Sequence, residues 1–121
     1  MARPLIDSFR DAGNGFIHVI RTQRNMVIHL IVALLTIIFG WRLGLTAVEF
    51  SLIMVCIVMV IAGEIFNTVV ETVVDLCTRE YHPLAAQAKD MAAAGVLVLS
   101  VTAAIIGVII FGPKLWSLFC R

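Results

Sequence analysis

Three long apolar segments constrain the fold of this chain more than any other feature of its sequence. They cover residues 25–41, 48–76 and 91–111, and the last of them contains no Asp, Glu, Lys or Arg. About 20 apolar residues suffice for a helix to cross the hydrocarbon core of a bilayer. The chain of 121 residues is 61% hydrophobic and only 14% charged, whereas a soluble domain carries about 25% charged residues. We therefore predict an all-α membrane protein, with three transmembrane helices in a single domain over residues 1–121.

The segment before these spans, residues 4–21, predicts an amphipathic helix that Pro4 opens. At about 100° per residue, its polar side chains fall on one stripe and its apolar side chains on the opposite one. The polar stripe holds Asp7, Arg10, Asp11, Asn14, His18 and Arg21, and the apolar stripe holds Leu5, Phe9, Phe16, Val19 and Ile20. A helix of this kind belongs in the membrane interface.

The basic residues predict the orientation of the spans. Six of them lie before the first span or in the polar stretch at residues 77–90, and three lie on the other side: Arg3, Arg10, Arg21, Arg24, Arg79 and Lys89 against Arg42, Lys114 and Arg121. The positive-inside rule then places the N-terminus and the polar stretch in the cytoplasm. Gly112-Pro113 is expected to end the third helix. The net charge of +1 offers no basic stripe, so we expect no nucleic-acid partner.

Four polar residues share one face of the second transmembrane helix. Glu64, Asn67, Glu71 and Asp75 fall within an arc of roughly 80°, and ionisable groups inside a span suggest function. The alternative interpretation is a polar seam between helices. A ladder of carboxylates from bilayer to cytosol suits a reaction between a lipid hydroxyl and a soluble nucleotide, because carboxylates bind the Mg²⁺ that bridges phosphate oxygens. A deep carboxylate can take the hydroxyl proton, and Lys89 can neutralise phosphate charge.

The same residues carry a resemblance to a known family. Glu64-Ile-Phe-Asn67-Thr-Val-Val-Glu71-Thr-Val-Val-Asp75, then Glu80-Tyr-His82-Pro-Leu and Ala88-Lys89-Asp90, closely resemble the prokaryotic diacylglycerol kinase family, which includes undecaprenol kinase. The resemblance covers nearly the whole chain. It implies a homotrimer in the bacterial inner membrane, with one interfacial and three transmembrane helices per subunit. It also implies ATP as co-substrate, Mg²⁺ as cofactor, and active sites between subunits on the cytoplasmic side.

The resemblance implies a role for each matched position. Glu64 resembles the general base, Glu71 the magnesium ligand, and Asn67 a positioning group beside it. The positions that match the nucleotide-binding set are Asp75, Glu80, Tyr81, His82, Lys89 and Asp90, with Asp11 and Asn14 on the surface helix. Family members often carry a second metal-binding glutamate where this chain has Gln23. An amide oxygen can ligate Mg²⁺ without adding negative charge.

These features predict an ATP-dependent lipid kinase that transfers the γ-phosphoryl group to the hydroxyl of a membrane lipid alcohol. Residues 21–25, 82–84 and 111–115 look more like the undecaprenol kinase branch than the proteobacterial diacylglycerol branch, so undecaprenol is the favoured acceptor and diacylglycerol the next. The alternatives are a small proton-coupled transporter that uses Glu64 and a purely structural oligomer. We interpret His29 as a hydrogen-bonded packing residue and Glu49 as a solvated charge at the outer interface.

Overall fold

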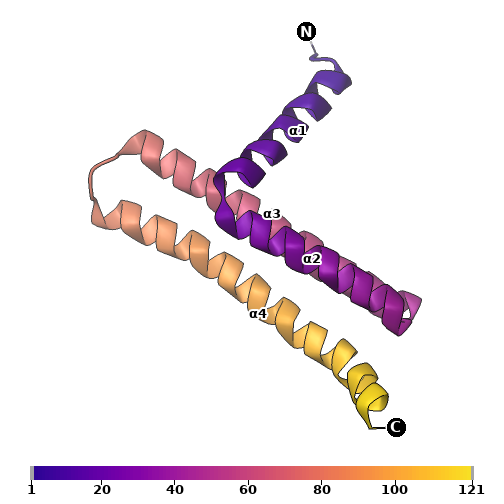
Figure 1. Cartoon of the computed structure of the whole chain (residues 1–121). Coiled ribbons are helices and arrows are strands. Elements are labelled where there is room, and N and C mark those ends of the chain that lie inside the picture. The colour runs from indigo at the N-terminus through magenta and orange to yellow at the C-terminus, as the bar shows by residue number, and fades with distance from the viewer. Residues whose placement is uncertain (1, 121) are drawn as a thin grey trace.

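The computed structural model describes residues 2–120, which form four helices connected by short segments. The helices are α1 (Leu5–Thr22), α2 (Arg24–Leu43), α3 (Ala47–Cys77) and α4 (Pro83–Phe119). The last three are each long and apolar enough to cross a membrane, so the prediction of an all-α membrane protein with three spans is confirmed. In Figure 1, α2, α3 and α4 run side by side with alternating direction, and α1 projects away from them.

A single non-helical residue separates α1 from α2. Gln23 has an extended backbone with φ −112° and ψ 109°, and it ends α1 and begins α2. The chain therefore changes direction sharply there (Figure 1). Phe9 at 75% exposure and Leu5 at 78% show that much of the apolar stripe of α1 has no protein cover. An exposed apolar stripe on a helix that leaves the bundle is the arrangement expected of an interfacial helix.

The connection from α2 to α3 is built from two well-known end motifs. Gly44 ends α2 with φ +69°, a left-handed conformation that glycine adopts without a steric penalty. Thr46 then caps α3, since its hydroxyl accepts from the N–H of Glu49 at 3.2 Å and the Glu49 carboxylate accepts from the N–H of Thr46 at 3.0 Å. Lys114 of α4 lies 3.3 Å from the same carboxylate. The half-buried Glu49 side chain therefore takes part in a helix cap and an ion pair. It is not simply the solvated charge that was expected from the sequence.

The structure corrects both ends of the third span. The helix that contains residues 91–111 begins at Pro83 and continues through Pro113 to Phe119, so the prediction that Gly112-Pro113 ends it is wrong. Proline removes one backbone donor, and a membrane helix tolerates that loss where local adjustments satisfy the freed carbonyl. At the other end, Pro83 takes the first helical position, where its missing N–H costs nothing. Hydropathy identified only the apolar part of this helix, so the prediction missed its first turns, which are more polar.

The bundle is held together mainly along α3, which packs closely against α4 and also contacts α2. Gly63 on α3 lies against Leu99 of α4, since an added Cβ would lie 2.5 Å from the end of that side chain. Glu64 is the next residue and is 1% exposed, so the polar face of α3 begins inside the bundle. At 1.5 Å per residue α3 and α4 measure about 46 and 55 Å, longer than the roughly 30 Å hydrocarbon core. The end of the bundle at the α3–α4 connection can therefore extend out of the bilayer.

Candidate active site

The polar face of α3 grades from buried to exposed along its length. Glu64 is 1% exposed and Asn67 is 8% exposed, Glu71 is half-buried, and Asp75 is exposed near the end of the helix. Thr68 lies beside this face, and its hydroxyl donates to the Glu64 carbonyl at 2.9 Å. The structure therefore places these residues in the predicted order, from a buried carboxylate at Glu64 to an exposed one at Asp75.

A cavity of about 320 Å³ opens beside the deep end of this face. Residues of α2, α3 and α4 line it, and they include Asn25, His29, Glu64, Asn67 and Ser100. Within residues 2–120, three buried side-chain polar atoms have no hydrogen-bond partner: Glu64 Oε1, Asn67 Oδ1 and Ser100 Oγ. All three belong to residues that line this cavity. Because buried polar atoms are nearly always paired in native proteins, this cavity suits a polar occupant, whether water or a ligand group.

Asn67 and Glu71, which lie one turn apart on α3, each offer a side-chain oxygen that could bind a metal ion. The Asn67 Nδ2 atom lies 3.4 Å from Glu71 Oε1, and the Asn67 amide oxygen is the unpartnered atom described above. A carboxylate and an amide oxygen are hard ligands that suit Mg²⁺, which typically takes one or two carboxylates and completes its shell with phosphates and water. No cluster of three or more His, Cys, Asp or Glu side chains suited to a metal occurs in the part of the chain that the structure describes.

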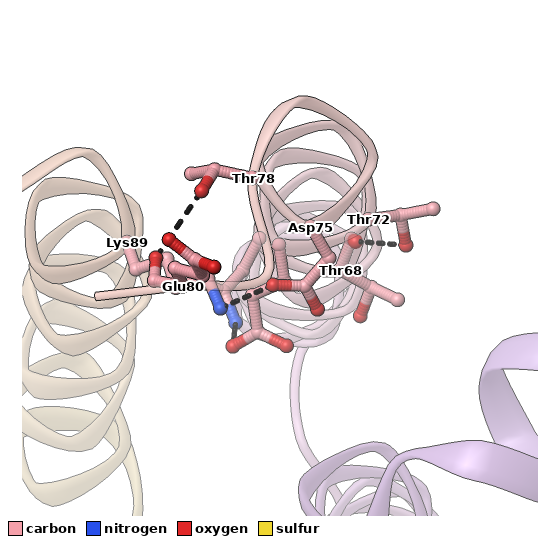
Figure 2. A network of polar contacts seen from close by, with 8 residues as sticks. Thr68, Thr72, Asp75, Thr78, Glu80 and Lys89 are labelled. Atoms are coloured by element: carbon pink, nitrogen blue, oxygen red, sulfur yellow. Dashed lines mark hydrogen bonds and ion pairs between the residues drawn. The ribbon is translucent and has the colours of Figure 1, made fainter. Parts of the chain in front are cut away.

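Asp75 and Lys89 form an ion pair between α3 and α4, with 2.5 Å between Lys89 Nζ and Asp75 Oδ1. Figure 2 shows the two side chains meeting in the space between the helices. Their side chains are 55% and 40% exposed respectively, so the pair is open to solvent. The structure thus brings together two residues that the sequence assigns to nucleotide binding and holds them at the surface end of the carboxylate ladder.

The remaining nucleotide candidates near this end lie around the α3–α4 connection. Glu80 and Tyr81 belong to the connection and are exposed, and Asp90 is exposed on α4. Thr78 donates to the Glu80 carbonyl at 3.2 Å (Figure 2). His82 caps α4, since its Nδ1 accepts from the N–H of Leu84 at 3.1 Å. The capping bond leaves Nε2 as the nitrogen of His82 available to another group.

The structure does not bring the three remaining candidates to this cluster. Asp11 and Asn14 are exposed on α1, which points away from the α3–α4 connection in Figure 1, and Asp11 pairs with Arg3. Gln23 is half-buried at the break between α1 and α2. Among the described residues, no hydrogen bond joins its side chain to Glu71, and it is not part of the cavity lining. Its assignment as a metal ligand stays a prediction.

Three polar lining residues were not predicted to belong to the site: Asn25, His29 and Ser100. His29 and Ser100 also line a second cavity of about 290 Å³, whose walls are otherwise mostly aliphatic residues of α2, α3 and α4. These two residues therefore stand between a polar cavity and an apolar one. A histidine within an apolar span was a usable signal, whereas a single serine in a membrane helix is common and gave none.

Comparison with known proteins identifies the family of this chain. Residues 10–111 match the family described as prokaryotic diacylglycerol kinase. The chain belongs to this family. It is 42% identical to an undecaprenol kinase of Bacillus subtilis over 89% of its own length and 88% of that protein. It is 38% identical to a diacylglycerol kinase of Synechocystis sp. over 98% of its length and 68% of that protein. A diacylglycerol kinase of Escherichia coli shares 36% identity over 74% of this chain and 70% of its own length.

Membership in the prokaryotic diacylglycerol kinase family confirms the predicted class of enzyme, a lipid kinase of the membrane. It also removes the reason to treat Glu64 as the carboxylate of a proton-coupled transporter or the helices as a purely structural oligomer. The carboxylate ladder of α3 lies entirely within the matched residues.

Proposed function

We propose that this chain transfers the γ-phosphoryl group of ATP to the hydroxyl of a membrane lipid alcohol, with undecaprenol as the favoured acceptor and diacylglycerol as the next. The observation that carries the proposal is the polar face of α3, which runs from the buried Glu64 at a cavity to the exposed Asp75–Lys89 pair. One end of this face suits a lipid hydroxyl, and the other suits a soluble nucleotide.

In the proposed reaction the lipid oxygen attacks the γ-phosphorus while the bond from that phosphorus to the β–γ bridging oxygen breaks, and ADP leaves with the electron pair. Glu64 takes the hydroxyl proton through its free Oε1 and later releases it to solvent. Lys89 neutralises phosphate charge, and Asp75 orients the Lys89 ammonium. Glu71, with the amide oxygen of Asn67, would hold Mg²⁺, and Gln23 would add a neutral ligand. When bound, the metal neutralises charge on the phosphate oxygens.

The remaining nucleotide contacts are proposed for residues that surround the α3–α4 connection and for the surface helix. They are Glu80, Tyr81, His82 and Asp90, with Asp11 and Asn14 from α1. Because α1 points away from this connection within one chain (Figure 1), contacts from α1 would require a neighbouring subunit or a movement of α1 about Gln23. We place these residues on the cytoplasmic side of a bacterial inner membrane, in a homotrimer.

Undecaprenol is favoured because the relative that is 42% identical over most of both chains is an undecaprenol kinase. The apolar cavity of about 290 Å³ next to His29 and Ser100 also suits the hydrocarbon part of an acceptor, whichever lipid alcohol supplies it. The acceptor is thus proposed from sequence similarity, and the cavity supports only its apolar character.

The proposal is tested by phosphoryl transfer from ATP labelled at the γ-position, using purified protein in detergent micelles. Undecaprenol and diacylglycerol are supplied singly and then together at equal concentration. We expect labelled lipid from either alcohol, no transfer without one, and mostly labelled undecaprenyl phosphate in competition. Preferential labelling of diacylglycerol would reverse the order of acceptors, and the absence of any labelled lipid would refute the proposed reaction.

A further inference from the structure

Glu64 has very few polar neighbours for a carboxylate that is 1% exposed. Neither of its side-chain oxygens takes part in a hydrogen bond with residues 2–120, and Oε1 is fully buried without a partner. The Nε2 atom of His29 lies 3.7 Å from Oε2, within the range of an ion pair. The other hydrogen-bonding side chains that line the cavity, Asn25, Asn67 and Ser100, form no such contact with Glu64. His29 is therefore the donor that the fold supplies to this carboxylate.

A buried carboxylate without a donor is strongly unfavourable, and its orientation is poorly fixed. His29 belongs to α2 and Glu64 to α3, so their contact crosses the interface between two helices and depends on how those helices pack. The imidazole also forms part of the wall shared by the polar and apolar cavities. The Nε2 atom of His29 faces the carboxylate proposed as the base.

We propose that His29 is a positioning residue for the lipid kinase reaction: it holds Oε2 of Glu64 and so leaves Oε1 free to take the proton of the acceptor hydroxyl. This inference rests on the proposed function of Glu64. The 3.7 Å separation is longer than a hydrogen bond, as contacts among catalytic groups often are in the absence of substrate. His29 acts on the base and not on the nucleotide, whose proposed site lies toward the far end of α3.

The test compares two amide substitutions that differ by one methylene. In His29→Gln the amide nitrogen reaches about as far as Nε2 of the imidazole, whereas in His29→Asn it falls short. We expect His29→Gln to retain most of the turnover, and His29→Asn and His29→Leu to lose about ten- to hundredfold in kcat, the magnitude of a lost charged hydrogen bond. The half-saturating concentration of ATP should be unchanged. Ser51→Ala is the control, because Ser51 lines neither of the two cavities and its hydroxyl bonds to the Ala47 carbonyl; its kcat should equal that of the unmodified protein.

A double-mutant cycle separates positioning from a general effect on packing. Because His29 acts through Glu64, His29→Leu should cause no further loss in kcat when it is added to Glu64→Gln. Any of three results overturns the inference: wild-type kcat in His29→Asn and His29→Leu, equal losses in His29→Gln and His29→Leu, or losses that multiply in the double mutant. If instead Glu64→Gln alone retained its turnover, the proposed role of Glu64 would fail, and His29 would lose its role with it.

Discussion

Lys89 is the cation that the structure places at the exposed end of the carboxylate ladder, where it pairs with Asp75. We predict that Lys89→Met raises the half-saturating ATP concentration about ten- to hundredfold, because it removes one charged contact to phosphate. The free energy of unfolding should change by no more than about 1 kcal/mol, since exposed ion pairs contribute little. Lys114→Met is the control: it breaks the ion pair with Glu49 at the opposite end of the bundle and should leave the ATP dependence unchanged.

Substitutions at Glu71 and at Gln23 test the proposed magnesium site in different ways. Glu71→Gln should abolish metal-dependent nucleotide binding, because Glu71 is the one carboxylate assigned to the metal and Asn67 alone supplies a neutral oxygen. Gln23→Glu should lower the half-saturating Mg²⁺ concentration, since it adds an anionic ligand. Nucleotide binding with and without Mg²⁺ measures the first effect, and titration of activity against free Mg²⁺ at fixed ATP measures the second. An unchanged midpoint in Gln23→Glu would show that this side chain does not reach the metal.

For individual residues, helical geometry was enough to predict which polar side chains share one face of α3. Glu64, Asn67, Glu71 and Asp75 share a face because of their spacing on α3, and their gradient of burial follows from the length of that helix. The contact of His29 with Glu64 could not be predicted, because it depends on how α2 and α3 are rotated and shifted against each other. Helical periodicity determines a face within one helix but not its register against another.

The capping box at the start of α3 allows a prediction at the level of a single helix. Thr46→Ala removes the hydroxyl that accepts from the Glu49 N–H at 3.2 Å and should lower the free energy of unfolding by about 0.5–2 kcal/mol. Equilibrium unfolding in detergent micelles measures the change. The matched control is Ser51→Ala in the next turn, whose hydroxyl bonds only to the Ala47 carbonyl, and which should change it by less than about 0.5 kcal/mol. Equal effects of the two substitutions would contradict the capping interpretation.

The helices themselves were predicted better than their ends. Apolar length was enough to identify α2, α3 and α4, because a spanning segment must satisfy its backbone internally. Apolar length did not predict the ends of α4. The helix continues for six residues beyond Pro113 to Phe119, and it begins at Pro83 in polar sequence. The ion pair between Lys114 and Glu49 joins the continued segment to α3, and such a contact between distant positions cannot be predicted from hydropathy.

The homotrimer proposed above would cover part of the apolar surface that a single chain exposes. Large apolar side chains are exposed along all three spans, and in a membrane they contact either lipid or another subunit. We predict that mixing Glu64→Gln chains with Lys89→Met chains restores part of the activity at an ATP concentration too low to support Lys89→Met alone, because a site shared between subunits can be assembled from one intact contribution of each. If co-assembled chains show no activity at any ratio, both residues act from the same subunit.

The most direct test of the account as a whole is the turnover of Glu64→Gln, measured as phosphoryl transfer from ATP to a lipid alcohol at saturating Mg²⁺. The substitution keeps the size of a side chain that is 1% exposed and removes its ability to accept the hydroxyl proton. We predict that kcat falls about 10²–10⁴-fold, while the half-saturating ATP concentration stays the same because the proposed nucleotide residues lie further along α3 and on α4. A kcat close to that of the unmodified protein would contradict the assignment of Glu64 as the base, and with it the mechanism proposed for this lipid kinase.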